Sequence, residues 1–170
     1  TIVKKLPAVE TLGCTTVICS DKTGTMTRGE MTVQRICAGA DVMKVTGVGY
    51  EPEGDFLIEN RKVDPKNEGL CLLLKAGALC NDAKLEKDPS LGRWIIKGDP
   101  TEGALLVAAA KSGLWKEDLE RQQPRIDEIP FSSETKRMTT VHSVTGGKKI
   151  AYMKGAPEIV LDKCTRVLTN

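Results

Sequence analysis

The apolar and polar residues of this chain follow patterns that predict strands and helices. Partial alternation predicts strands at 31–37 and 41–46, and a short apolar run predicts another at 93–97. Two strand-like runs, 138–144 and 149–154, flank a pair of glycines, which is typical of a β-hairpin. The pattern therefore predicts antiparallel pairing in the last part of the chain.

Helical stretches lie between these strands. Residues 65–81 are rich in leucine and alanine and form a stretch long enough for a largely buried helix. Residues 115–123 predict a short polar helix, and residues 159–163 predict another short helix. Glycine, proline and mixed charges predict loops at 47–54 and 82–92.

A further helix has a clear start and end in the sequence. Asp99 is a favourable N-cap, Pro100 fits the first helical position, and Glu102 falls at the capping-box position. A stretch rich in leucine and alanine then runs to Gly113, a typical helix stop. Local helix chemistry is thus one sufficient explanation for these polar residues.

A candidate nucleophile follows a short apolar run near the start of the chain. Residues 17–19 predict a buried strand, and Asp21 would lie just beyond its carboxyl end, where open α/β sheets place reactive groups. A carboxylate is already ionised at neutral pH and attacks a phosphoryl group without a base, whereas the alternative is that Asp21 only caps a turn. Gly24 lets the backbone approach a ligand. Donors for phosphate oxygens accompany it: Lys22, Thr23 and Thr25.

Composition narrows the class of protein. The chain has 170 residues, 40% of them apolar and 28% charged, which suits a globular domain with a real core. A net charge of +2 and an aromatic content of 4% argue against a nucleic-acid-binding surface. No apolar run approaches the roughly 18 residues of a membrane helix, and the start of the chain has no signal-peptide pattern.

The cysteines suggest a reducing environment. None of the six forms a C-x-x-C pair and the chain has one histidine, His142, so a zinc site is not expected. His142 lies in the middle of a predicted strand, where we expect a structural role. Most cysteines lie within apolar runs, which predicts reduced core residues: Cys14, Cys19, Cys37, Cys71, Cys80 and Cys164.

The string Asp21-Lys22-Thr23-Gly24-Thr25 resembles the phosphorylation motif of the P-type cation-transporting ATPases. Residues 6–13 resemble the family's approach to that motif, and Met26 stands where leucine is common. The resemblance implies that Asp21 accepts a phosphoryl group from ATP. It also implies that Asp21 and Thr23 bind Mg²⁺ together with acids that lie downstream of this chain in the family.

Three later strings, 98–104, 131–138 and 154–158, resemble the family's nucleotide-pocket motifs. The resemblance implies an adenine contact for Glu102, stacking on adenine for Phe131, a nucleotide contact for Lys136, and places for Lys154 and Gly155 in the pocket. Structural alternatives remain open, because Glu102 also fits helix capping and Phe131 also fits a core aromatic. Ser133 stands where the calcium-pump branch often has arginine, and suggests weaker binding or a different contact.

The resemblance also implies the fold and the setting. We expect an α/β (α+β) fold in which residues 31–170 form a nucleotide-binding domain, a twisted antiparallel β-sheet flanked by helices. Residues 1–30 would begin a parallel-sheet phosphorylation domain. We expect a cytosolic, monomeric segment of a membrane protein whose partners are ATP and the membrane, actuator and remaining phosphorylation domains of the same polypeptide. Nucleic acid is not an expected partner.

The expected function is ATP-driven cation transport through an aspartyl-phosphate. The 6–13 string and the Gly-Tyr-x-Pro-x-Gly loop at 49–54 favour calcium as the cation. The fragment should bind ATP without useful turnover, because the downstream acids are absent from it. One alternative is a haloacid-dehalogenase-type phosphohydrolase, which Thr23 disfavours because that class has an acid two residues after its nucleophile. Another is a nucleotide-binding module in which Asp21 is inert.

Overall fold

The computed structural model describes residues 7, 10, 13–17, 19–20, 29–39 and 41–168. The helices and strands of these residues are, in chain order, β1 (Arg35–Ala38), β2 (Asp41–Val45), β3 (Phe56–Ile58), β4 (Arg61–Lys62), α2 (Glu68–Leu79), β5 (Lys84–Lys87), β6 (Trp94–Lys97), α3 (Pro100–Lys111), α4 (Lys116–Gln122), β7 (Arg125–Ile129), β8 (Arg137–Val144), β9 (Lys148–Gly155) and α5 (Pro157–Leu161).

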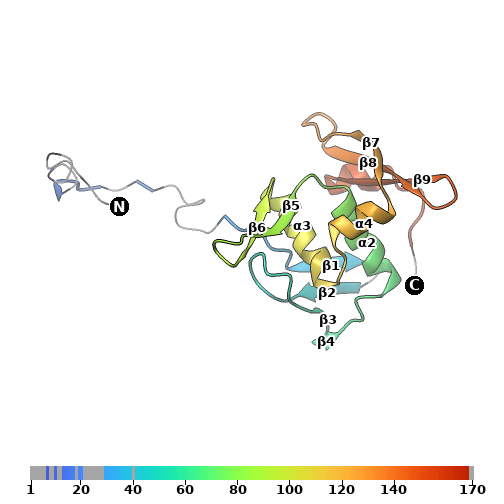
Figure 1. The fold of residues 1–170 in the computed structure, drawn as a ribbon, viewed down its shortest axis with the longest axis horizontal. Coiled ribbons are helices and arrows are strands. Elements are labelled where there is room, and N and C mark those ends of the chain that lie inside the picture. Colours follow the sequence, from blue (N-terminus) through green and yellow to red (C-terminus); the bar gives the residue numbers. More distant parts are fainter. Residues whose placement is uncertain are drawn as a thin grey trace.

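The described strands form three antiparallel sheets, in the orders β1-β2-β3-β4, β5-β6 and β7-β8-β9. Figure 1 shows α2, α3 and α4 at the centre, with the four-stranded sheet on one side and the three-stranded sheet on the other. Helix α2 contacts both β1 and β9, and α3 contacts β5 and β6. The expectation of antiparallel strands flanked by helices is confirmed, with the strands divided among three sheets.

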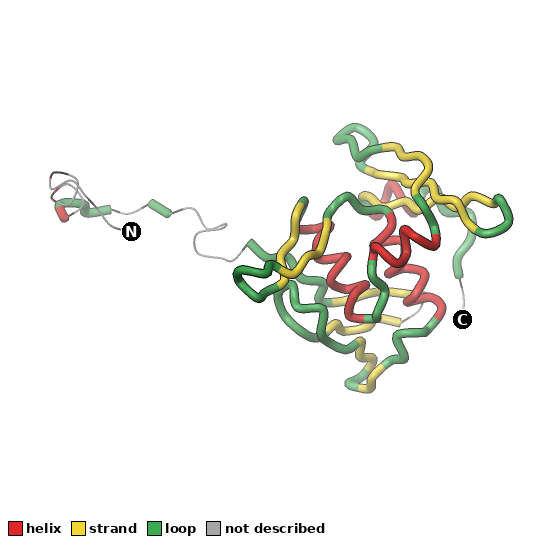
Figure 2. The backbone as a smooth tube through the Cα atoms, viewed as in Figure 1, coloured by secondary structure: helices red, strands yellow, loops and turns green. Residues whose placement is uncertain are grey.

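The two longer helices, α2 and α3, lie near the centre of the folded part (Figure 2), and both supply buried side chains to the hydrophobic core. On α2 the buried side chains recur at helical spacing: Leu70, Leu74, Ala78 and Leu79. Helix α3 is buried over most of its surface, including an unbroken stretch from Leu106 to Ala110. At Gly103 the helix lies against β6 so closely that a Cβ atom would come 2.6 Å from the Ile96 side chain. The absence of a side chain therefore brings the start of α3 onto this strand.

The β8–β9 hairpin confirms the pairing predicted from the glycine pair. Its register runs from Arg137 opposite Gly155 to Val144 opposite Lys148, and the intervening turn contains Gly146 and Gly147 at positive φ. His142 is fully buried on β8, with Nδ1 2.8 Å from the Gln123 carbonyl oxygen. Because a carbonyl only accepts, Nδ1 is the donor, and the expected structural role is consistent with this contact.

Three elements differ from the sequence expectations. Four residues of the predicted 82–92 loop form strand β5, because Leu85 is buried there and pairs with Ile96 while its charged neighbours are more exposed. Residues 125–129 form β7, for which no strand was predicted. Of the predicted buried strand at 17–19, residue 18 lies outside the described residues, and the burial prediction is wrong for the other two, since Val17 is 71% exposed and Cys19 is also exposed. No sheet of the described residues includes either of them. A strand without paired neighbours leaves its apolar side chains exposed to solvent.

The prediction of core cysteines is also wrong for most of them. Only Cys80 is buried, Cys71 is intermediate, and the others are exposed: Cys14, Cys19, Cys37 and Cys164. On β1 the reason is the alternation of a strand, since Ile36 faces the core and Cys37 therefore faces away. All six are free thiols. Within the part of the chain that the structure describes, no helix has the length and apolar character needed to cross a membrane.

Candidate functional site

A cleft of about 600 Å³ lies where the start of α3 meets the end of β9. Segments far apart in the sequence line it: Asp99, Thr101, Glu102, Leu105, Phe131, Lys154 and Gly155. Four of the predicted nucleotide-site residues, Glu102, Phe131, Lys154 and Gly155, thus lie around one cavity. Asp99, Thr101 and Leu105 join them as neighbours on α3 or at its cap, and sequence reasoning had assigned them no contact with a ligand.

The N-terminus of α3 forms one wall of this cleft. The Asp99 carboxylate caps it by accepting hydrogen bonds from the backbone N–H groups of Thr101 at 2.8 Å and Glu102 at 3.2 Å. These bonds, that from Glu102 foremost, hold the pKa of Asp99 below its ordinary value. The predicted N-cap is therefore confirmed, and the first turn of the helix is fixed at the edge of the cleft.

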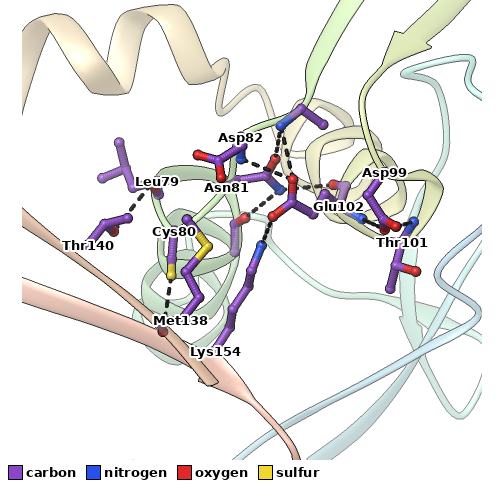
Figure 3. A network of polar contacts seen from close by, with 12 residues as sticks. Leu79, Cys80, Asn81, Asp82, Asp99, Thr101, Glu102, Met138, Thr140 and Lys154 are labelled. Carbon is purple, nitrogen blue, oxygen red and sulfur yellow. Dashed lines mark hydrogen bonds and ion pairs between the residues drawn. The ribbon is translucent and has the colours of Figure 1, made fainter. Parts of the chain in front are cut away.

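Glu102 does not form the predicted capping box. Instead of reaching back to Asp99, its Oε2 accepts hydrogen bonds from the backbone N–H groups of Asp82 and Ala83, both at 3.1 Å. Its Oε1 forms an ion pair with Lys154, as Figure 3 shows. The capping-box prediction fails because these donors from the turn after α2 and from β9 satisfy the carboxylate in place of the cap N–H.

Lys154 and Gly155 occupy the end of β9, opposite the start of β8. The side chains of Lys154 and Glu102 are 24% and 17% exposed, so their ion pair is largely shielded from water. At Gly155 a Cβ atom would lie 2.3 Å from the Lys136 carbonyl oxygen and 2.7 Å from the Arg137 Cα. A glycine here is thus required by the close approach of β8, and it sets Lys154 at the cleft.

Phe131 lies two residues beyond β7 with its side chain 60% exposed. The alternative that it is a core aromatic is therefore wrong, and its ring is open to the cleft that it lines. Lys136 is not among the residues that line this cleft. It has a φ of 50° at the end of a turn, and its backbone carbonyl accepts a hydrogen bond from Ala156 at 2.9 Å. Its backbone thus packs against Gly155, while its side chain is exposed.

The turn after α2 carries residues that sequence reasoning missed. Asn81 is fully buried, and its backbone carbonyl oxygen accepts hydrogen bonds from the side chains of Lys116 at 2.7 Å and Arg125 at 2.6 Å. Arg125 also forms an ion pair with Asp82 at 2.7 Å. Burial of Lys116 lowers the pKa of its ammonium group. The sequence offered one indication of this turn, an Asn-Asp pair that directly follows an apolar helix.

The predicted phosphorylation motif, Asp21 to Thr25, lies outside the described residues. The Mg²⁺ ligands proposed there, Asp21 and Thr23, lie outside them too. Among the residues that the structure does describe, no three or more histidine, cysteine, aspartate or glutamate side chains gather as a metal site. The described cleft is therefore a site of one cation, one aromatic ring and carboxylates held by backbone donors.

Comparisons with known proteins identify the family of this chain. A family model described as "P-type ATPase, cytoplasmic domain N" matches residues 70–170, a range that includes every residue lining the cleft. The chain belongs to the P-type ATPase family. Within this P-type ATPase domain the cleft residues come from the start of α3, the end of β9 and the segment after β7.

Individual P-type ATPases match over almost the whole chain. A calcium-transporting ATPase of Bacillus subtilis (strain 168) is 44% identical over 167 residues, which are 98% of this chain and 18% of that protein. The cation-transporting ATPase pma1 of Synechocystis sp. is 44% identical over 175 residues, 99% of this chain and 19% of the relative. A calcium-transporting ATPase type 2C member 1 of Bos taurus is 44% identical over 169 residues, which are 96% of this chain and 17% of that protein. The chain thus spans about a fifth of the length of these relatives.

Proposed function

We propose that the cleft binds the adenosine part of ATP, and that this chain is the nucleotide-binding part of a cation pump. The observation that supports this most strongly is the meeting of Glu102, Phe131 and Lys154 around one cavity of about 600 Å³. Ligand pockets of this size typically combine apolar lining with a few polar groups that fix orientation. The described cleft has that composition.

The chemistry of each side chain fits a purine nucleotide. An exposed phenylalanine ring offers a flat surface on which a base can stack. The Glu102 carboxylate has about four lone-pair positions, and two hydrogen bonds and one ion pair use three of them. One position therefore remains to accept a hydrogen bond from an amino group of the base. Lys154 has three N–H donors and its contact with Glu102 uses one, so it retains donors for the ligand.

For the whole protein we propose ATP hydrolysis through an aspartyl-phosphate at Asp21, coupled to transport of a cation. Two of the three relatives described above are named as calcium-transporting, which supports Ca²⁺ as the cation. Residues 31–170 would be the nucleotide-binding domain and residues 1–30 the start of the phosphorylation domain. Asp21 and Thr23 would bind Mg²⁺, which would neutralise phosphate charge, together with acids outside this chain. Its partners would be ATP and the other domains of the same membrane protein.

Titration of the chain with ATP, followed by two-dimensional NMR, tests the binding site. We expect shifts for Glu102, Phe131 and Lys154, with smaller ones for the peripheral Lys136. Replacing Lys154 with methionine should weaken binding at least about tenfold, since hydrogen bonds to charged groups contribute about 1.5–3 kcal/mol. Lys149→Met is the matched control, because Lys149 is exposed on the same strand and does not line the cleft. Silent cleft residues, or equal losses in both variants, would contradict the proposal.

Incubation with Mg²⁺ and γ-labelled ATP tests the turnover of the fragment. We expect the isolated chain to bind ATP and to acquire no acid-stable label at Asp21, because the proposed phosphate cradle is incomplete in it. The Asp21→Asn variant sets the background. Label that appears at Asp21 in the isolated chain would contradict this part of the proposal. Hydrolysis of phosphate esters other than ATP would favour the phosphohydrolase alternative.

A further inference from the structure

The side chain of Asn81 connects the end of α2 to the start of α3. Its Nδ2 donates hydrogen bonds to the carbonyl oxygens of Gly77 at 3.0 Å and Glu102 at 2.9 Å. Its Oδ1 accepts a hydrogen bond from the backbone N–H of Ala83 at 2.9 Å. Asn81 is 0% exposed, so each of these polar atoms is satisfied inside the protein. One buried amide thus links two helices and the start of the following segment.

The same turn supplies the donors that hold Glu102. The backbone nitrogens of Asp82 and Ala83 both lie 3.1 Å from Glu102 Oε2, and Figure 3 shows Asn81 and Asp82 beside that carboxylate. The path of the backbone at 81–83 decides where these two donors point. Asn81 fixes that path from both sides, since it bonds to Ala83 in its own turn and to the Glu102 backbone on α3.

Two positively charged side chains from distant parts of the sequence, Lys116 and Arg125, also bind this turn. Lys116 at the start of α4 donates to the carbonyl oxygens of Asn81 and Ala83, at 2.7 Å and 2.9 Å. Arg125 at the start of β7 donates to the Asn81 carbonyl at 2.6 Å and to Asp82 at 2.7 Å. The segment that ends in Phe131 begins with this arginine, so the turn is tied to both sides of the cleft.

We propose that Asn81 is a positioning residue for the nucleotide site. It acts through Glu102: it aligns the Asp82 and Ala83 N–H groups, which orient the carboxylate, and the carboxylate orients Lys154. This proposal rests on the proposed function for its ligand, ATP. It adds a residue that neither lines the cleft nor contacts the nucleotide, and it assigns to the turn after α2 the part of a rigid support for the binding residues.

The test compares Asn81→Ala with Asn67→Ala. Asn67 caps the other end of the same helix by accepting a hydrogen bond from the Leu70 N–H at 3.1 Å, so its loss also lowers stability but leaves the cleft intact. ATP affinity is measured by calorimetry under conditions where both variants are folded. We expect Asn81→Ala to weaken ATP binding about tenfold, the equivalent of about one hydrogen bond, and Asn67→Ala to leave affinity within twofold.

A double-mutant cycle distinguishes positioning from a general loss of structure. If Asn81 acts through the carboxylate, Asn81→Ala should have little further effect on affinity once Glu102 is alanine. Amide hydrogen exchange gives a second measure: exchange at Asp82 and Ala83 should accelerate in Asn81→Ala more than elsewhere in the core, and not in Asn67→Ala. Asn81→Ser, which replaces the amide with a smaller hydrogen-bonding group, a hydroxyl, is used instead if Asn81→Ala does not fold.

Three results would overturn the proposal. They are an unchanged ATP affinity in Asn81→Ala, an undiminished effect of this substitution in the Glu102→Ala background, and exchange at Asp82 and Ala83 that follows global stability alone. If the unsubstituted chain fails to bind ATP, the proposed function is wrong. The exchange measurement then decides on its own whether Asn81 positions Glu102.

Discussion

Removal of the Phe131 ring is the most direct test of the cleft, because it separates ligand binding from folding. The side chain is 60% exposed, so Phe131→Ala should change the free energy of unfolding by no more than about 0.5 kcal/mol. Base–aromatic stacking contributes about 1–3 kcal/mol per base when measured by alanine substitution. At about 1.4 kcal/mol per tenfold, the dissociation constant for ATP should rise about 5- to 150-fold.

Isothermal titration with ATP measures this change, and urea unfolding of the same samples measures stability. Ile129→Ala is a matched control, because Ile129 is 62% exposed on the adjoining strand and does not line the cleft. Phe131→Trp retains a flat ring and should preserve most of the affinity. The stacking argument is refuted if Phe131→Ala binds ATP as the unsubstituted chain does, or if Ile129→Ala weakens binding to the same extent.

Two further predictions concern the backbone around the cleft. Gly155→Ala should destabilise the chain by about 1–3 kcal/mol in urea unfolding, since its Cβ would lie 2.3 Å from the Lys136 carbonyl oxygen. Gly77→Ala is the control without a clash, because a Cβ atom there would come no closer than 3.6 Å to the Leu105 side chain. Asp99→Ala should cost about 0.5–2 kcal/mol through loss of the α3 cap. Because the folded-state pKa of Asp99 is lowered, its ionised form stabilises the fold above the unfolded-state pKa, and this part is lost as the pH falls through the folded value. A difference between Asp99→Ala and the unsubstituted chain that persists unchanged in acid would contradict the assignment.

The sequence was informative where structure depends on neighbouring residues. The cap at Asp99 and the glycine turn of the last hairpin follow local rules, and both are confirmed. The predicted helix at 65–81 is present as Glu68–Leu79, again because its composition and length decide it. The site residues Glu102 and Lys154 were found through motif resemblance, and the structure shows that they contact each other across 52 residues of sequence.

Other features depended on partners that no local pattern reveals. Strand β5 has three charged residues in four, and it exists because Leu85 is covered and the chain pairs with β6. The hydrogen bonds from Arg125 to the turn after α2 join residues 43 to 46 positions apart. Glu102 matched a capping box by spacing, yet its carboxylate accepts hydrogen bonds from the backbone N–H groups of that turn instead of from the cap N–H. Tertiary donors thus outcompeted the local pattern.

The ion pair between Glu102 and Lys154 has a consequence for charge selectivity. A nucleotide bound as proposed would meet an ammonium group whose field is already largely offset by a carboxylate at contact distance. Attraction from Lys154 to a polyphosphate over a long range is therefore weak, and added salt should change the affinity little. If the cleft binds a nucleotide as we propose, it would select that ligand by the shape of the base, and it would release an anionic product without separating it from an unopposed cation.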